Sequence, residues 1–318
     1  MPIHIVIPDD YQLAAKSLQA LKNREGFEFT VLGDIKKSSL VENYFNEAQA
    51  LILIRERTIV DSAFLKRTPN LKIISQTGKL ARNIDIDACT QAGVAIVEGS
   101  GSPTAPAELT WLLIQASRRK LVTSVNAMKL GFWQTEMGSV LNNQTIGILG
   151  YGKIGKIIAQ YAKAFGMIVQ VWGSDRAKEA ARNDGLAVPE DRQAFFSTSD
   201  VITVHQRLVA ETQGNISLED LSLMKTDALF VNTSRAELVC EDALYKALLR
   251  GRPGYAALDV YEEEPIYDSN FHLLTMPNVL CTPHIGYVEK NSYESYFNIA
   301  INNVIRYFQG DSSHVINL

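Results

Sequence analysis

The sequence predicts an α/β protein built from two Rossmann-like or flavodoxin-like domains, each with a parallel sheet. Short apolar runs alternate with longer amphipathic stretches along the chain, which is typical of βαβ units. The prolines at Pro103 and Pro106 interrupt a first series of such units, and a second series begins at Thr145. The length of 318 residues also fits two domains of about 150 residues each.

The first series lies before Pro103, where β-branched apolar runs mark the strands and helical spacing marks the segments between them. The predicted strands are Ile3–Ile7, Phe27–Val31, Ala50–Ile54, Leu71–Ser75 and Val94–Val97. The predicted helices are Tyr11–Leu21, Leu40–Asn46 and Ile84–Ala92. After the prolines, Ala107–Leu121 is predicted to be helical because Glu108 lies in its first turn and basic residues lie in its last turn, as the helix dipole favours.

The second series repeats the pattern up to the C-terminal region. Its predicted strands are Ile146–Leu149, Ile168–Trp172, Val201–Val204, Leu229–Val231, Tyr255–Asp259 and Val279–Cys281. Its predicted helices are Lys153–Phe165, Arg192–Phe196, Leu218–Leu223 and Glu241–Leu249. A final helix is predicted over Asn291–Gln309, where apolar and aromatic residues recur at helical spacing.

Composition and charge exclude several classes of protein. The formal net charge of −4 argues against nucleic acid or an anionic membrane as the main partner. No apolar run approaches the length of about 18 residues that a membrane helix needs. The N-terminal run before Asp9 has no basic flank and is interpreted as a first strand rather than a signal peptide. The 3 cysteines are far apart and lack metal-ligand spacing, so we expect no disulfide and no metal site, and a reducing, cytoplasmic location.

A glycine-rich turn joins the first strand and the first helix of the second series. Gly150 allows a tight turn, Gly152 lets the backbone approach a pyrophosphate, and Gly155 lets the helix pack closely on the strand. The pyrophosphate would lie on the N–H groups that begin the helix. The candidate cofactor-binding residues of this turn are Gly150, Tyr151, Gly152, Lys153, Ile154 and Gly155.

The residues that would bind the ribose of a dinucleotide follow the next strand. Ser174 and Asp175 lie just past the strand end, near the position where an acidic side chain would accept from the ribose hydroxyls of NAD. Arg176 could instead meet the 2′-phosphate of NADP, and both charges could simply be solvated in a loop. NAD is favoured because Asp175 would repel a phosphate, but NADP stays open.

Three further polar segments each follow a predicted strand. NTSRAELV contains Arg235, LDVYEEEP contains Asp259 and Glu264, and TPHIG contains His284. Ligands in open α/β sheets bind outside the carboxyl ends of the parallel strands, where these three segments are expected.

With these motifs the chain resembles the D-isomer-specific 2-hydroxyacid dehydrogenases, the family of D-3-phosphoglycerate, D-lactate and glyoxylate/hydroxypyruvate enzymes. The resemblance spans essentially the whole chain and is strongest from Asn142 to Gly286, where GYGKIG, NTSRAELV, LDVYEEEP and TPHIG occur in the family's order. It implies hydride transfer between NAD(P)(H) and a small 2-keto acid or its D-2-hydroxy acid.

The resemblance also implies roles for single residues. Arg235 matches the arginine that holds the substrate carboxylate and polarises its carbonyl, and His284 matches the general acid and base. Glu264 matches the carboxylate that bonds this histidine, and Asp259 matches the residue that contacts the nicotinamide carboxamide. Each of them has a structural alternative, such as a solvated surface charge.

The N-terminal part of the chain, which would bind the substrate, also resembles the family but departs from its sequence pattern. Arg55 stands at a substrate-contacting position of the family, and Lys79 and Leu80 belong to the loop whose N–H groups receive the substrate carboxylate. The family pattern R-A-G-x-G-x-D-N-I-D is broken here, and Lys79 adds a cation. The departures from the family are Gln76 for Arg, Leu80 for Gly, Arg82 for Asp, Gly173 for the ribose-binding Asp, and Ala236 for Gly. They leave the keto acid unidentified.

The family organisation implies that the substrate domain is discontinuous. It would comprise residues 1–100 and 289–318, and residues 101–288 would form the dinucleotide-binding domain. The segment Ala107–Val140, with Trp133, resembles the family's dimerisation arm and predicts a homodimer, although Trp133 could instead fill an interdomain core.

Two other functions remain open from the sequence. The fold could serve as a nicotinamide-sensing scaffold, but the presence of Arg235, Glu264 and His284 together argues against a lost activity. Formate or phosphite oxidation is a second alternative, and Glu264 disfavours formate because formate enzymes carry Gln at this position.

Overall fold

Two parallel sheets organise the chain, and they belong to two separate units. The computed structural model describes residues 2–38 and 41–317. Unit 1 contains the residues up to Ser102 together with those from Val288 onward, and unit 2 extends from Pro103 to Tyr287. The prediction of two parallel-sheet α/β domains is confirmed. Among the described residues, no helix is both long and apolar enough to cross a membrane.

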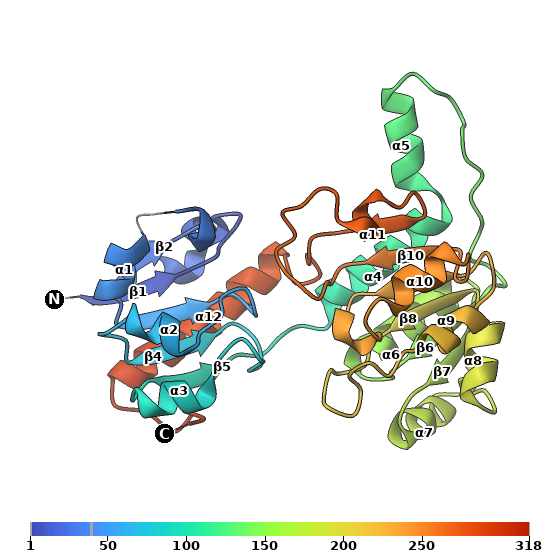
Figure 1. The fold of residues 1–318 in the computed structure, drawn as a ribbon. Coiled ribbons are helices and arrows are strands. Elements are labelled where there is room, and N and C mark those ends of the chain that lie inside the picture. Colours follow the sequence, from blue (N-terminus) through green and yellow to red (C-terminus); the bar gives the residue numbers. More distant parts are fainter. Residues whose placement is uncertain (1, 39–40, 318) are drawn as a thin grey trace. The chain divides into compact units, whose positions relative to one another are not determined.

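Unit 1 contains a five-stranded parallel sheet in the order β2-β1-β3-β4-β5 (Figure 1). Its strands are β1 (Ile3–Ile7), β2 (Phe27–Val31), β3 (Ala50–Leu53), β4 (Ile73–Gln76) and β5 (Ala95–Glu98). Its α-helices are α1 (Val41–Glu47), α2 (Ser62–Lys66), α3 (Ile86–Gln91) and α12 (Lys290–Phe308). The C-terminal helix α12 packs on β3 and β4, so the last part of the chain completes the N-terminal unit.

One helix predicted in unit 1 is wrong. Tyr11–Leu21 forms two short 3-10 helices, Ala14–Ser17 and Gln19–Leu21, instead of one α-helix. Leu13 has a left-handed backbone with φ of 51° and Leu18 is extended, so the backbone cannot continue through either residue as a helix. Helix α2 was not expected, and position 40 of the predicted helix Leu40–Asn46 lies outside the described residues.

Unit 2 contains a six-stranded parallel sheet in the order β11-β10-β9-β8-β6-β7. Its strands are β6 (Thr145–Leu149), β7 (Ile168–Trp172), β8 (Val201–Val204), β9 (Leu229–Asn232), β10 (Tyr255–Leu258) and β11 (Val279–Cys281). A single parallel bridge from Gln170 to Ala187 adds one residue pair beyond β7. With this bridge counted as a third strand, the order is that of a dinucleotide-binding Rossmann sheet, whose switch point lies between β6 and β8.

Helices cover both faces of this second sheet (Figure 1). The helices that pack on the sheet are α4 (Thr104–Arg118), α6 (Lys153–Ala164), α7 (Asp175–Asn183), α8 (Arg192–Thr198), α9 (Leu218–Leu223), α10 (Ala243–Leu249) and α11 (His272–Thr275). Helix α5 (Leu121–Lys129) has no buried residue. Along the strands, Ile148 and Val231 face a core shared with α4 and α6, while Phe230 faces a core shared with α8, α9 and α10. Because both faces are buried, the strands read as continuous apolar runs.

Two predictions in unit 2 need correction. The single helix Ala107–Leu121 is divided, because Lys120 has a left-handed backbone with φ of 53° between α4 and α5. The charges at Asp175 and Arg176 are not in a loop: they open α7, and the hydroxyl of Ser174 caps this helix by accepting from the N–H of Ala177 at 3.3 Å. Serine at this position commonly begins a helix.

Candidate active site

The glycine-rich turn has the geometry that its sequence predicts. Gly150 has φ of 98°, and a Cβ there would lie 2.7 Å from the backbone of His205 at the end of β8. A Cβ on Gly155 would lie 2.5 Å from the carbonyl oxygen of Gly150, so helix α6 can approach the turn only with glycine. A Cβ on Gly152 would meet no protein atom within 4 Å. Open space beside Gly152 is what a pyrophosphate approaching the backbone requires.

The N-terminus of α6 suits an anion. Gly152 is its N-cap and has no side chain to accept from the first-turn N–H groups, and the first turn contains no acidic residue. These N–H groups, which include those of Lys153 and Ile154, carry the positive end of the helix dipole. The ring of Tyr151 is buried, and its hydroxyl donates to Asp184 Oδ2 at 3.0 Å. Burial, with Asp184, raises the pKa of Tyr151 to about 12, so the hydroxyl keeps its proton at neutral pH. A cofactor-binding role for Tyr151 stays a prediction.

The ribose end lacks a carboxylate at the tip of β7. Gly173 follows the strand with φ of 155°, and a Cβ there would lie 3.6 Å from the backbone of Gly150. The side chain of Asp175 is 100% exposed and pairs with Lys178 at 2.8 Å, which lowers the pKa of Asp175. The ribose-binding roles of Ser174 and Asp175 therefore stay predictions, and Asp175 is directed to Lys178.

Buried side chains hold the loop that carries Arg235. Asn232, at the end of β9, accepts from the N–H of Ser234 at 3.0 Å and donates to the carbonyl oxygen of Arg235 at 2.8 Å. The hydroxyl of Ser234 donates to the carbonyl oxygen of Val204 in β8 at 2.7 Å. The hydroxyl of Thr233 bonds that of Thr110 in α4 at 2.7 Å. The backbone that presents Arg235 is thus tied to two strands and one helix.

Asp259 holds the loop that carries His284. Its carboxylate is fully buried and accepts from the hydroxyl of Thr282 at 2.6 Å and from the N–H groups of Ile285 and Gly286, both at 2.8 Å. Burial raises the pKa of Asp259, and these hydrogen bonds act in the opposite direction. Between the donors, His284 has a left-handed backbone with φ of 50°, a conformation uncommon outside glycine. The carboxylate therefore fixes the loop in this conformation.

His284 and Glu264 form a hydrogen-bonded pair. Nδ1 of His284 lies 2.6 Å from Oε2 of Glu264, and the two side chains are 21% and 32% exposed. The other oxygen of Glu264 accepts from the N–H of Tyr261 at 2.9 Å, which orients the carboxylate. Because Nδ1 faces Glu264, Nε2 is the ring nitrogen left to exchange a proton with a ligand. Unit 2 therefore brings together Arg235, Asp259, Glu264 and His284 at one edge of its sheet.

The other predicted site residues lie at the carboxyl edge of the unit 1 sheet. The guanidinium of Arg55, just after β3, lies against Gly78, and a side chain at Gly78 would displace it. Lys79 forms an ion pair with Glu98, and the N–H of Leu80 donates to Oε2 of Glu98 at 2.9 Å. Among residues 2–38 and 41–317, no group of three His, Cys, Asp or Glu side chains could hold a metal ion.

A buried amide, the side chain of Gln76, holds this loop. Gln76 stands where the resembling family has Arg; it is fully buried, donates to the carbonyl oxygen of Lys79 at 2.8 Å and accepts from Asn83 at 3.0 Å. A neutral amide makes these bonds without the desolvation penalty of a buried charge. The departure at Gln76 therefore leaves the loop well ordered.

Comparison with known proteins identifies the family. Residues 110–286, more than half of the chain, match the D-isomer specific 2-hydroxyacid dehydrogenase, NAD binding domain. The chain belongs to this family. The resemblance seen in the motifs is confirmed, and the Rossmann unit of this 2-hydroxyacid dehydrogenase family member is its NAD binding domain.

Several relatives of this 2-hydroxyacid dehydrogenase family member are known. It is 33% identical over 92% of its length to D-3-phosphoglycerate dehydrogenase of Methanocaldococcus jannaschii, of which it covers only 56%. It is 35% identical over 83% of its length to glyoxylate reductase of Thermococcus litoralis, of which it covers 82%.

Solved structures match the fold over nearly its whole length. An oxidoreductase from Ralstonia solanacearum has 48% identity and a TM-score of 0.95, with 99% of this chain and 97% of that chain covered. D-lactate dehydrogenase from Aquifex aeolicus, complexed with NAD and lactic acid, has 26% identity and a TM-score of 0.74, with 99% of each chain covered.

Asn232 and Glu98 were not among the residues predicted from the sequence. Both are the last residue of a strand, Asn232 of β9 and Glu98 of β5. A polar residue at the end of an apolar strand was the signal that identified Arg235 and Asp259. Applied to every strand, the same signal could have found both residues.

We expect Gly152→Ala and Gly155→Ala to separate cofactor binding from folding. A methyl group at Gly152 meets no protein atom, so unfolding free energy without cofactor should change by less than about 1 kcal/mol. The dissociation constant of NADH should rise at least about tenfold, because the methyl group occupies the pyrophosphate approach. Gly155→Ala, which forces a contact with Gly150, should destabilise the unit by about 1–3 kcal/mol. Thermal unfolding and fluorescence titration with NADH measure both; a Gly152→Ala protein with unchanged NADH affinity would contradict the assignment.

Proposed function

We propose that this chain is an NAD-dependent dehydrogenase that transfers a hydride between NAD(H) and a small 2-keto acid or its D-2-hydroxy acid. The observation that carries this proposal is the 2.6 Å bond between His284 and Glu264, in the same unit as Arg235 and the glycine-rich turn. When bound, the cofactor supplies or accepts the hydride at its nicotinamide ring.

The Arg235 guanidinium binds the substrate carboxylate and the carbonyl oxygen that is reduced. A planar fork of charged donors fits a carboxylate and stabilises the negative charge that develops on the carbonyl oxygen. Asn232 fixes the backbone from which this side chain extends. We therefore assign Arg235 to substrate orientation and carbonyl polarisation.

His284 moves the proton. In reduction, Nε2 of His284 gives a proton to the carbonyl oxygen as the hydride reaches the carbonyl carbon, and in oxidation it takes the proton from the hydroxyl group. Glu264 accepts from Nδ1, orients the ring and stabilises the imidazolium. Asp259 acts through the loop: by fixing the backbone around His284 it sets the direction of the ring.

We assign recognition of the substrate carboxylate in unit 1 to Arg55, and we assign the neighbouring loop, which contains Lys79 and Leu80, to the shape of the place that the rest of the substrate takes. Arg55 provides a charged fork, and its position against Gly78 brings it beside the backbone of this loop. Substitution of Leu80 for the glycine of the family pattern adds a bulky side chain, which favours a small keto acid.

NAD is the cofactor that we assign to unit 2. The proposal rests on the match of the family's NAD binding domain and on the open approach beside Gly152. NADP stays an alternative, because the tip of β7 carries Gly173 rather than a carboxylate that would exclude a 2′-phosphate, and Arg176 lies in the first turn of α7.

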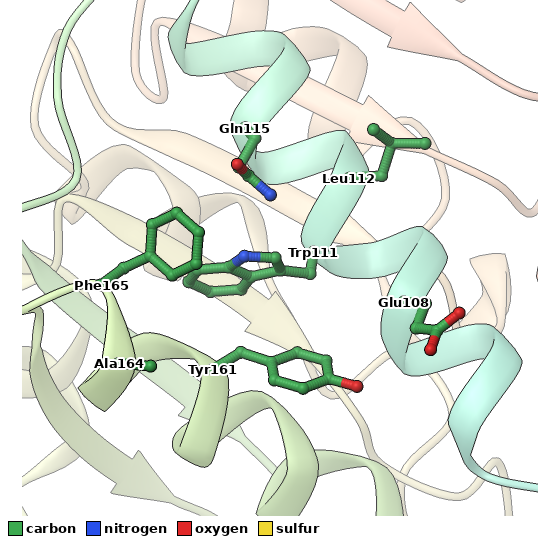
Figure 2. A pocket seen from close by; sticks show the side chains of 7 residues that line it. All are labelled: Glu108, Trp111, Leu112, Gln115, Tyr161, Ala164 and Phe165. Atoms are coloured by element: carbon green, nitrogen blue, oxygen red, sulfur yellow. The ribbon is translucent and has the colours of Figure 1, made fainter.

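We also propose that two copies form a homodimer through unit 2. Helix α5 and the segment after it extend away from the sheet of unit 2 (Figure 1). This arm exposes large apolar side chains, namely Leu121, Val122, Val125, Met128, Leu130, Phe132, Trp133, Met137 and Val140. Exposed apolar patches of this kind mark protein interfaces. On the same unit, a hollow between α4 and α6 is lined by Trp111, Tyr161 and Phe165 and would receive apolar side chains of the partner copy (Figure 2).

The cellular location that we propose is the cytoplasm. Cys89, Cys240 and Cys281 are all free thiols, and Cys89 is buried. Free thiols persist in a reducing compartment.

The central test is turnover. Purified protein should oxidise NADH when given glyoxylate, pyruvate or hydroxypyruvate, with NADPH measured in parallel. His284→Ala should lower kcat by at least about 100-fold, the usual contribution of a general acid, while the dissociation constant of NADH changes little. His272→Ala, at a half-buried histidine of the same unit whose ring packs on Tyr245, is the matched control. Binding of NADH without turnover of any keto acid would contradict the dehydrogenase proposal and favour a nicotinamide-sensing scaffold.

The role of Asp259 is tested with Asp259→Asn. The amide would place its NH2 group against the N–H of either Ile285 or Gly286, which bond different oxygens of Asp259, so the histidine loop should lose its geometry and kcat should fall about 10- to 100-fold. The dissociation constant of NADH should stay within about threefold, because the lost hydrogen bonds hold the histidine loop rather than the cofactor. Asp242→Asn, at an exposed carboxylate of the same unit, is the control. A loss of NADH affinity with unchanged kcat would favour the nicotinamide contact that the family resemblance implies.

The dimer is tested by light scattering after size-exclusion chromatography. The unaltered protein should have twice the mass of one chain, and Trp133→Glu combined with Leu130→Glu should have the mass of one chain, because both apolar side chains are 75% exposed on the arm. Ile59→Glu, an exposed apolar position in unit 1, should leave the dimer intact. A monomeric unaltered protein at micromolar concentration would overturn the proposal.

A further inference from the structure

The carboxyl edge of the unit 1 sheet contains an acidic residue among its anion-binding groups. Strands β3, β4 and β5 are neighbours in the sheet and run parallel, so their ends meet at one edge. Arg55 follows β3, Lys79 and Leu80 follow β4, and Glu98 ends β5. Glu98 is thus next to the groups assigned to the substrate.

Glu98 occupies two donors that an anion would otherwise use. Its Oε2 accepts from the N–H of Leu80 at 2.9 Å, and its Oε1 forms an ion pair with the ammonium group of Lys79. The side chain of Glu98 is 31% exposed, so the carboxylate is held at the loop rather than extended into solvent. A carboxylate of the protein therefore fills the place that a second anionic group of a ligand would take.

We infer that Glu98 sets the substrate class: it selects 2-keto acids whose carboxylate is their only anionic group, against keto acids with a second carboxylate or a phosphate. The inference rests on the proposed dehydrogenase function. Glu98 acts in two ways, because it neutralises Lys79 and because its own charge repels a second anion. The guanidinium of Arg55 is enough to bind the one carboxylate of a singly charged substrate.

This inference changes the role of Lys79. Its side chain is 70% exposed, so its ion pair with Glu98 is a weak surface interaction. Removing the charge of Glu98 should make the Lys79 ammonium available to a ligand. The pair therefore determines selectivity, whereas Arg55 determines binding of the common carboxylate.

Glu98→Gln tests the inference, because the amide oxygen can keep the bond from the N–H of Leu80, while the charge is lost and an NH2 group replaces the oxygen that pairs with Lys79. Two matched pairs of substrates are compared by kcat/KM: 2-oxobutyrate with oxaloacetate, and hydroxypyruvate with its phosphorylated form. The unaltered protein should prefer the singly charged member of each pair by at least about tenfold, and Glu98→Gln should reduce this preference at least about tenfold. Glu42→Gln, which removes a carboxylate paired with Arg67 elsewhere in unit 1, should leave the preference unchanged.

A second variant identifies the group that Glu98 controls. Adding Lys79→Met to Glu98→Gln should abolish the gain toward the doubly charged substrates, since that gain comes from the released ammonium group. An unaltered protein that prefers the doubly charged members, or a Glu98→Gln protein with unchanged preference, would overturn the inference.

Binding separates this inference from the proposed function. Dissociation constants of 2-hydroxybutyrate and malate, measured by calorimetry on the NAD-saturated protein, should show the same change of preference in Glu98→Gln. If no keto acid is turned over but this change is seen, the dehydrogenase proposal fails and the role of Glu98 stands. If turnover is seen and neither rates nor affinities change their preference, the dehydrogenase proposal stands and the role of Glu98 fails.

Discussion

The hydrogen bonds of Asp259 are the interaction on which the catalytic edge of unit 2 depends. One buried carboxylate at the end of β10 binds three donors in the loop that follows β11. His284 lies between these donors and has a left-handed backbone, which costs free energy. The hydrogen bonds to Asp259 offset this cost. The pairing of His284 with Glu264 needs this backbone, because the direction of the ring depends on it. The acid and base chemistry therefore depends on a side chain that need not touch the substrate.

The same design recurs at the other loops. Asn232 fixes the loop of Arg235 with both atoms of its amide. Gln76 donates to the carbonyl oxygen of Lys79 in the loop that follows it, and its own oxygen accepts from the side chain of Asn83. In each case a buried polar residue at the end of a parallel strand satisfies the backbone of the loop that follows it. Rigid support of this kind positions reactive groups within the tolerance that catalysis needs.

Much of this architecture could be predicted from the sequence because its signals are local. Apolar runs indicated the strands, and the glycine spacing indicated the tight turn at Gly150 and the close helix packing at Gly155, whereas the pyrophosphate contact of Gly152 stays a prediction. The helix α7 was not predicted, although Ser174 is a strong capping residue, and a loop at Asp175 and Arg176 was one of the alternatives left open. The single helix expected over Tyr11–Leu21 failed because the left-handed backbone of Leu13 has no signal in its sequence.

Contacts between distant segments could not be predicted from local patterns. The bond from Leu80 to Glu98 and the closure of unit 1 by α12 each join residues that are far apart in sequence, and only the family resemblance indicated the second.

The stereochemistry of the product tests the central claim most directly. If Arg235, His284 and the bound cofactor hold the substrate in the arrangement of the D-isomer specific family, only one face of the carbonyl receives the hydride. Chiral chromatography of glycerate formed from hydroxypyruvate and NADH should therefore detect the D enantiomer alone. Formation of L-glycerate, or of both enantiomers, would contradict the account.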